Sequence, residues 1–186
     1  MNELLNRLSG GTLASDGDAD LVAKDVLQNP TRFNELIEGL YVTNDIIRAR
    51  TTHALEKISR VYPEWFSLNL KALIEIAEKD KVPFVRWHLA MMFANLSFLG
   101  KEVKKIFNIL WYLLDDESVF VKSWTISGLC ILGRNYPEHK SKILAKLRPL
   151  RNYQSAAIRT RAAKAVDVLE HTYLPLPNGW VKIKRK

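Results

Sequence analysis

A β-branched residue followed by a basic residue recurs four times along this chain at a nearly constant spacing. The pairs are Ile47-Arg48, Val85-Arg86, Val121-Lys122 and Ile158-Arg159, and successive pairs are 38, 36 and 37 residues apart. Each pair stands near the start of a stretch with apolar residues at helical spacing. A constant period of this length is typical of a chain that uses one supersecondary unit several times.

Positions at a fixed offset from each pair carry the same kind of side chain. The position eight residues after the first member is a large apolar residue: Leu55, Phe93, Leu129 and Val166. The position seven residues after it is mostly small: Ala54, Met92, Gly128 and Ala165. An apolar residue also stands eleven positions before each pair, in a preceding helical stretch: Leu36, Ile74, Leu110 and Leu147. The pattern therefore predicts units of two helices whose apolar stripes face each other and the next unit.

The predicted helices divide the chain into three parts. A short helix is expected at about 21–28, before Asn29-Pro30, and the opening 20 residues are expected to be loose. Four helix pairs follow: 31–41 with 45–60, 64–79 with 84–98, 101–114 with 118–133, and 138–148 with 156–171. The expected parts are an N-terminal segment 1–30, four units (31–62, 63–99, 100–136 and 137–172) and a basic tail 173–186.

The turn inside two of these units carries an aspartate. Asp80 and Asp116 each stand five positions before the valine of the next pair, and an alanine-containing second helix follows. This pattern resembles the HEAT repeat of the armadillo-like α-solenoid superfamily over about residues 31–171. Val42 and Tyr153 replace the aspartate in the first and last units, as atypical end units often do.

The resemblance implies an all-α fold, a right-handed α–α superhelix of about four helical hairpins. It also implies that the second helix of each pair lines a concave surface. The basic residue of each pair is expected to bond the turn carboxylate or the carbonyl groups of a neighbouring unit, which would hold the spacing between units.

Positive charge is concentrated toward the C-terminus. The net charge is −3 over residues 1–30, +1 over 31–139 and +10 over 140–186. Such a field attracts nucleic acid, an acidic protein surface or anionic lipid, or serves only to solubilise the end of the fold. Cys130 is the single cysteine, so no intramolecular disulfide can form, and no apolar run is long enough to span a bilayer. We therefore expect a cytoplasmic protein, or a nuclear one in a eukaryote, with no membrane insertion.

The sequence offers no pattern of catalytic or metal-ligating residues. Asp16, Asp18 and Asp20 imitate the start of a calcium-binding loop, but Leu21 and Leu27 occupy the positions that require glycine and glutamate. Asp20 is instead expected to cap the first helix. The four histidines lack the spacing of metal ligands. We expect no enzyme activity, no metal and no cofactor.

Candidate binding residues come from the second helices. Positions three and six residues after each pair share one helix face, and neither position is consistently apolar, so both are expected to face solvent. With the nearby Trp87, the candidate partner-binding residues on the concave face are Arg50, His53, Trp87, His88, Trp124, Arg161 and Lys164. An alternative is that Trp87 and Trp124 are partly buried between units.

The tail is expected to add positive charge without contributing to folding. Its basic residues are Lys182, Lys184, Arg185 and Lys186. Because the tail lies outside the repeated apolar positions, truncation after Tyr173 is expected to leave the fold intact.

The leading expectation for function is a non-enzymatic scaffold that binds a protein or peptide on its concave face. Nucleic-acid binding through the basic half is the alternative. A continuous positive groove from Arg50 to Lys164 would favour nucleic acid, whereas an apolar slot near Trp87 and Trp124 with an isolated basic end would favour a peptide. Head-to-tail association of the acidic and basic ends is a further expectation left open.

A third, enzymatic expectation comes from a resemblance to alkylpurine DNA glycosylases, which place tryptophans and a catalytic aspartate in the groove of HEAT-like repeats. Trp111 precedes Asp115 by about one helical turn, and Trp124 is near in sequence. However, Trp111 and Asp115 fall on a predicted outer helix or its turn, away from the predicted concave face.

Overall fold

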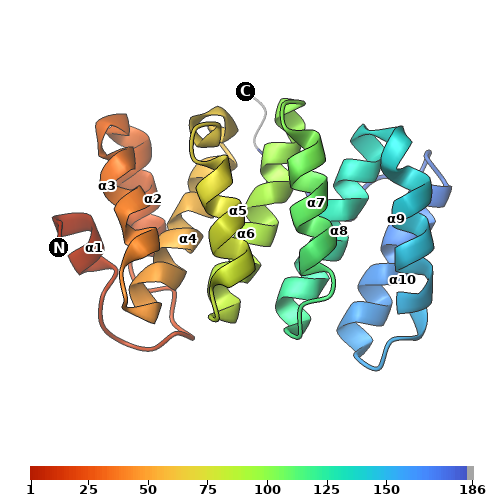
Figure 1. Ribbon diagram of the computed structural model, residues 1–186, viewed down its shortest axis with the longest axis horizontal. Coiled ribbons are helices and arrows are strands. Elements are labelled where there is room, and N and C mark those ends of the chain that lie inside the picture. Colours follow the sequence, from red (N-terminus) through yellow and green to blue (C-terminus); the bar gives the residue numbers. More distant parts are fainter. Residues whose placement is uncertain (184–186) are drawn as a thin grey trace.

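The computed structural model describes residues 1–183, which form ten α-helices joined by turns and short 3₁₀ segments, without a strand (Figure 1). The predicted all-α fold class is confirmed. Lys184, Arg185 and Lys186 lie outside the described residues. The α-helices are α1 Glu3–Arg7, α2 Ala19–Gln28, α3 Phe33–Ile37, α4 Asp45–Ser59, α5 Leu70–Lys79, α6 Pro83–Leu96, α7 Val103–Leu113, α8 Val119–Asn135, α9 Lys140–Leu147 and α10 Ala156–Glu170. Within this part of the chain, every helix is too short or too polar to cross a membrane.

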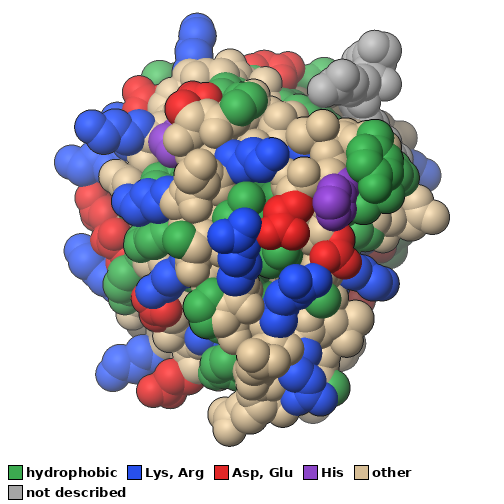
Figure 2. Space-filling view, turned by 90° about the vertical axis from the view of Figure 1, so that its right-hand side faces the viewer, with side chains coloured by type: hydrophobic (Ala, Val, Ile, Leu, Met, Phe, Trp, Pro, Cys, Tyr) green, Lys and Arg blue, Asp and Glu red, His purple; other side chains and the backbone are tan. Residues whose placement is uncertain are grey.

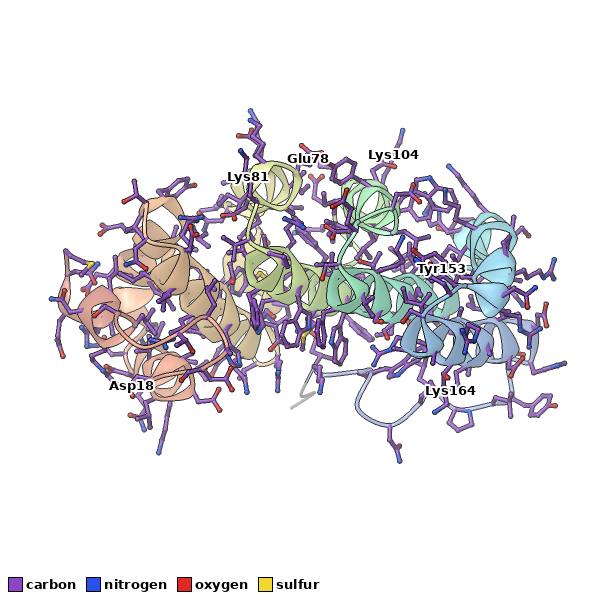
Figure 3. All side chains as sticks on the ribbon, turned by 90° about the horizontal axis from the view of Figure 1, so that it is seen from below. Asp18, Glu78, Lys81, Lys104, Tyr153 and Lys164 are labelled. Atoms are coloured by element: carbon purple, nitrogen blue, oxygen red, sulfur yellow. The ribbon has the colours of Figure 1, made fainter. Side chains whose placement is uncertain are left out.

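The helices lie in two layers along the long axis of the molecule (Figures 1 and 3). In one layer α2, α4, α6, α8 and α10 contact one another in that order. In the other layer α5 contacts α7, and α5, α7 and α9 lie against α6, α8 and α10. We call the layer of α4, α6, α8 and α10 the inner layer.

The core lies between the layers and follows the apolar positions found in the sequence. Leu55, Phe93, Leu129 and Val166 are all fully buried. Gly128 allows α8 to approach its neighbours closely, because a Cβ there would lie 3.1 Å from Leu110 Cδ2 and 3.4 Å from the Cβ of Ala94. The absence of a side chain at Gly128 therefore permits close helix packing.

The N-terminus differs from the prediction. Residues 3–7 form α1, where a loose segment was expected, because Asn2 accepts a hydrogen bond from the Leu5 N–H and Leu4 is fully buried. The predicted cap at Asp20 is also wrong: α2 begins at Ala19, and the Asp20 carboxylate instead binds Lys57 Nζ at 2.9 Å. A helix of five residues is too short to show a helical period in the sequence.

Arginine–aspartate contacts connect successive parts of the inner layer. Asp80 Oδ1 accepts from the Val82 N–H at 2.8 Å, which shapes the turn before α6, and its Oδ2 accepts from Arg48 Nε on α4 at 2.8 Å. Arg86 on α6 binds Asp116 in the same way. The predicted bond from the basic residue to a turn carboxylate is therefore confirmed for Arg48 and Arg86.

The other two basic residues of the pattern make different contacts. Lys122 lies 5.2 Å from the ring centroid of Tyr153. Arg159 donates to the carbonyl oxygens of Tyr153 and Gln154, at 2.9 Å each, in the turn before its own helix. Tyr153 stands where the aspartate of the earlier turns stood, so Lys122 has an aromatic ring in place of a carboxylate.

Candidate functional site

The N-terminal half of the predicted concave face is covered. Arg50 is 5% exposed, and its guanidinium donates hydrogen bonds to the carbonyl oxygens of Leu8, Ser9, Thr12 and Ser15 at 3.0 to 3.3 Å. The segment between α1 and α2 therefore lies over this part of α4. The expectation that Arg50 faces solvent is wrong, because its guanidinium is bonded to backbone carbonyl oxygens of the same chain.

The two candidate histidines are buried between helices rather than exposed. His53 on α4 and His88 on α6 stack with ring centroids 4.5 Å apart, and they are 9% and 6% exposed. His53 Nδ1 lies 3.3 Å from a carboxylate oxygen of Asp16, and Asp20 lies nearby. Neighbouring inner helices pack side by side, so the helix face that was expected to meet solvent instead meets the next helix.

This stack predicts a loss of stability in mild acid. Burial lowers the pKa of His88 to about 3, and the charge of His53 acts in the same direction. Burial also lowers the pKa of His53, outweighing the attraction of Asp16 and Asp20. Since a histidine of the unfolded chain binds a proton near pH 6.5, stability is fully present above about pH 6.5 and falls as the pH drops toward 3.

His88 alone contributes a fall of about 1.4 kcal/mol per pH unit in that window. Urea unfolding of the wild type, His88→Phe and His171→Gln between pH 7 and about pH 5 measures it, above the range in which ordinary carboxylates titrate. The pH dependence should be much weaker in His88→Phe and unchanged in His171→Gln, whose histidine is exposed. Parallel profiles for all three proteins would contradict the assignment.

The C-terminal half of the inner face contains an open groove of about 610 Å³ between α6, α8, α10 and the C-terminal segment. We call it the Trp124 groove. Its aromatic residues are Trp87 of α6, Phe120 and Trp124 of α8, and Trp180. Phe120 is 62% exposed and stacks on Trp87 with ring centroids 5.2 Å apart. The groove thus has an open apolar surface at Phe120, which packs on the ring of Trp87.

Cations lie beside these rings. The guanidinium carbon of Arg161 is 4.5 Å from the ring centroid of Trp124 and 5.5 Å from that of Trp180. Lys182 Nζ is 5.3 Å from the Trp124 ring, and the exposed Lys164 also lines the groove. No aspartate or glutamate is among the described residues that line it. Figure 2 shows the adjoining end of the molecule, where lysine and arginine side chains are spread over the face.

Two polar atoms in the wall of the groove lack a hydrogen-bond partner. They are Trp87 Nε1, which can only donate, and Ser123 Oγ on a side chain that is 7% exposed. Buried polar atoms in proteins are almost always bonded. Both atoms are buried behind the surface of the groove, although their side chains line it.

The turn before α8 and the tail fix the shape of the groove. Asp116 Oδ1 accepts from the Ser118 N–H at 2.8 Å, so α8 starts at Val119 and Phe120 falls in its exposed first turn. Trp180 follows a turn closed by a hydrogen bond from its N–H to the Pro177 carbonyl oxygen.

The groove and the N-terminal segment share one side of the molecule. Lys164 and Asp18 are on that side, whereas Lys104 is on the opposite side (Figure 3).

Trp180 contradicts the expectation that the tail is outside the fold. Its side chain is only 7% exposed, and Leu174 and Leu176 pack against the core. Arg134 of α8 donates to the carbonyl oxygens of Thr172 and Leu174 at 2.9 and 2.8 Å, which ties down the start of the tail. Of the predicted tail cations, the described Lys182 lies at the groove.

The structure brings together four of the seven predicted concave residues: Trp87, Trp124, Arg161 and Lys164. Sequence reasoning missed Phe120, Ser123 and Trp180 as parts of the site. A signal for Phe120 was present, because Ile46 and Phe84 occupy the equivalent position, one before the pair, and Phe84 also packs near Trp87.

The residues of the enzymatic expectation do not meet. Trp111 and Asp115 line a separate hollow between α5 and α7. From α9, Lys142 Nζ lies 4.7 Å from the centroid of the Trp111 ring, and Lys146 binds Asp115 at 3.4 Å. Trp124 lines the groove on the inner layer. Glu56, on the inner layer, is fully buried and bonded to Arg60, the C-cap residue of the same helix. These carboxylates therefore have structural partners.

The single thiol of the chain, Cys130, is buried. Burial raises the pKa of the Cys130 thiol to about 12, so it remains protonated and unreactive near neutral pH. Over residues 1–183, no three His, Cys, Asp or Glu side chains come together in a way that could hold a metal ion.

The chain matches none of the protein-family models, curated proteins or solved structures with which it was compared. The helix arrangement and the Trp124 groove are therefore the observations from which a function is inferred.

Proposed function

We propose that the chain is a HEAT-like α-solenoid of about four helical hairpins that binds a peptide segment of a protein partner in the Trp124 groove, without catalysis. The regular spacing of the basic pairs, the small residues where helices approach, and the contacts of Arg48 with Asp80 and of Arg86 with Asp116 support the architecture. Stacked units of this kind typically present an extended binding surface.

The observation that carries the function is the exposed aromatic surface of the groove. Phe120 is 62% exposed and rests on Trp87, while Trp124 and Trp180 form the walls beside Arg161. Tryptophan, tyrosine and arginine dominate the binding energy of protein interfaces. A groove of this volume suits a few residues of an extended or helical segment.

The distribution of charge favours a peptide over nucleic acid. A nucleic-acid track needs many phosphate contacts along its length. Here Arg50 is buried under backbone, and the exposed carboxylates of Asp16 and Asp20 lie beside His53 on the same half of the inner face. Acidic side chains and buried arginine therefore interrupt a positive track along this face, and an interrupted track favours a peptide over nucleic acid.

Selection from a display library of random short peptides tests the proposal. We expect the wild type to enrich peptides whose binding Phe120→Ala weakens by about tenfold or more, because an exposed aromatic anchor is lost. Tyr41→Ala is the matched control, since Tyr41 is 64% exposed and lies outside the groove. It should leave the affinity unchanged.

The same proteins are titrated with single-stranded oligothymidylate at low and moderate salt. Enrichment of no peptide above the Phe120→Ala background would contradict peptide binding. Tight oligothymidylate binding that falls steeply with salt, and depends on Phe120, would assign the groove to nucleic acid instead.

A further inference from the structure

Two cations lie on the Trp124 ring, and a third lines the same groove. Arg161 and Lys182 both lie on that ring, at 4.5 and 5.3 Å from its centroid, and Lys164 stands three residues after Arg161 on α10. Among residues 1–183 none of these three groups forms an ion pair. Like charges in a partly desolvated site repel one another more strongly than in water.

Inner-layer arginines have two kinds of partner: some bind a carboxylate, whereas Arg50, Arg134 and Arg159 donate to backbone carbonyl oxygens. Arg48 binds Asp80, Arg86 binds Asp116 and Arg60 binds Glu56, each within hydrogen-bond distance. Arg161 instead donates to the hydroxyl oxygen of Ser127 at 2.8 Å and more weakly to the Ser123 carbonyl oxygen. Its positive charge is therefore left uncompensated at the mouth of an aromatic groove.

Burial lowers the pKa of the Arg161 guanidinium, and burial followed by the charge of Arg60 lowers that of Lys182. Both directions indicate cations held where water solvates them poorly. A ligand anion would stabilise these poorly solvated cations, because attraction between opposite charges grows as water is excluded.

The lining of the groove indicates the same ligand chemistry. Trp87 Nε1 is a donor, and Ser123 Oγ can donate as well as accept. Both residues line the groove with Arg161 and Lys164, but these two atoms are buried, so the charged donors that line the groove are Arg161 and Lys164. The rings of Phe120 and Trp87 provide an apolar surface directly beside them.

We infer that the groove selects a peptide segment in which aspartate or glutamate residues flank an aromatic or large aliphatic side chain. This rests on the peptide-binding function proposed above. The apolar side chain lies on Phe120, and the carboxylates bind Arg161 and Lys164. A charge-assisted pair between guanidinium and carboxylate supplies both affinity and direction.

The test reads the composition of the peptides enriched by selection and measures the best of them by fluorescence polarisation. We expect the enriched peptides to be acidic and to contain an aromatic or large aliphatic residue. Replacing their acidic residues by the amides should weaken binding about tenfold or more, as should Arg161→Gln, because a partly buried charge pair is lost. Lys164→Gln should weaken binding only about twofold to fivefold, as for an exposed pair.

Two variants control for changes in fold and in net charge. Arg159→Gln alters an exposed arginine two residues from Arg161 on the same helix, and Lys104→Gln alters a lysine on the opposite side of the molecule (Figure 3). Both should bind the acidic peptide like the wild type. Lys164→Glu, at an exposed position, should weaken binding further than Lys164→Gln while leaving the melting temperature unchanged.

The outcomes separate this inference from the function on which it rests. Enriched peptides that depend on Phe120 but are neutral or basic would overturn the acidic preference and leave peptide binding intact. Enrichment of no peptide would overturn both. A concentration-dependent dimer that is lost in Arg161→Gln would show that the acidic occupant is a second copy of this chain, and would also overturn the inference.

Discussion

Replacing Arg50 by methionine is expected to lower the free energy of unfolding by about 3 kcal/mol, because hydrogen bonds from a charged donor to four buried or partly buried carbonyl oxygens are lost together. The apolar stem of methionine keeps the packing of the side chain. For a chain of this length the change corresponds to a fall in melting temperature of roughly 10 °C. Thermal and urea unfolding measure it.

The local backbone explains why this contact dominates the N-terminal segment. Gly11 and Gly17 have φ values of +71° and +49°, and a Cβ on Gly17 would lie 2.7 Å from Arg50 Cζ. The segment is thus folded closely around the guanidinium. Limited proteolysis of Arg50→Met should cut within residues 9–18, where the wild type resists.

Arg151→Met is the control, because Arg151 is exposed and makes one ion pair, with Asp167. An exposed pair of this kind contributes about 0 to 1 kcal/mol. Equal losses in the two variants, or an Arg50→Met protein that resists proteolysis within residues 9–18, would contradict the role given to Arg50.

Replacing Trp180 by alanine is expected to lower the free energy of unfolding by about 2 to 3 kcal/mol, at the low end for a buried tryptophan because the tail can detach without opening the core. The same change should abolish peptide binding, since Trp180 forms one wall of the groove beside Arg161. Urea unfolding and fluorescence polarisation measure the two effects.

Tyr173→Ala is the matched control on the same tail, where the aromatic side chain is 81% exposed. It should change stability by less than about 0.5 kcal/mol and leave binding unchanged. If Trp180→Ala were as stable as Tyr173→Ala, the tail would not belong to the folded unit, as the sequence alone had suggested.

The sequence predicted the helices of the inner layer to within a few residues, because α4, α6, α8 and α10 each bury a full helical stripe. It also predicted the role of Arg48 and Arg86, since an aspartate recurs at a fixed distance before the next pair. Short-range periodicity and turn chemistry were sufficient for both.

The same reasoning failed where distant segments meet. Nothing local in Arg50 or His53 indicates that residues 8–20 fold back over them, and a single tryptophan near the C-terminus carries no periodic signal of burial. Helix faces were assigned to solvent from polarity alone, yet His53 and His88 stack between α4 and α6. Long-range contacts decided which polar residues remain available for a partner.

The five tryptophans provide the most direct test of the Trp124 groove as the binding site. Each indole N–H gives its own signal in a nitrogen–proton correlation spectrum, and a selected acidic peptide is titrated into the labelled protein. We expect the signals of Trp87, Trp124 and Trp180 to shift, while those of Trp65, which stacks on Tyr62, and of Trp111 on α7 remain in place. Shifts confined to Trp65 or Trp111 would contradict the assignment of the groove.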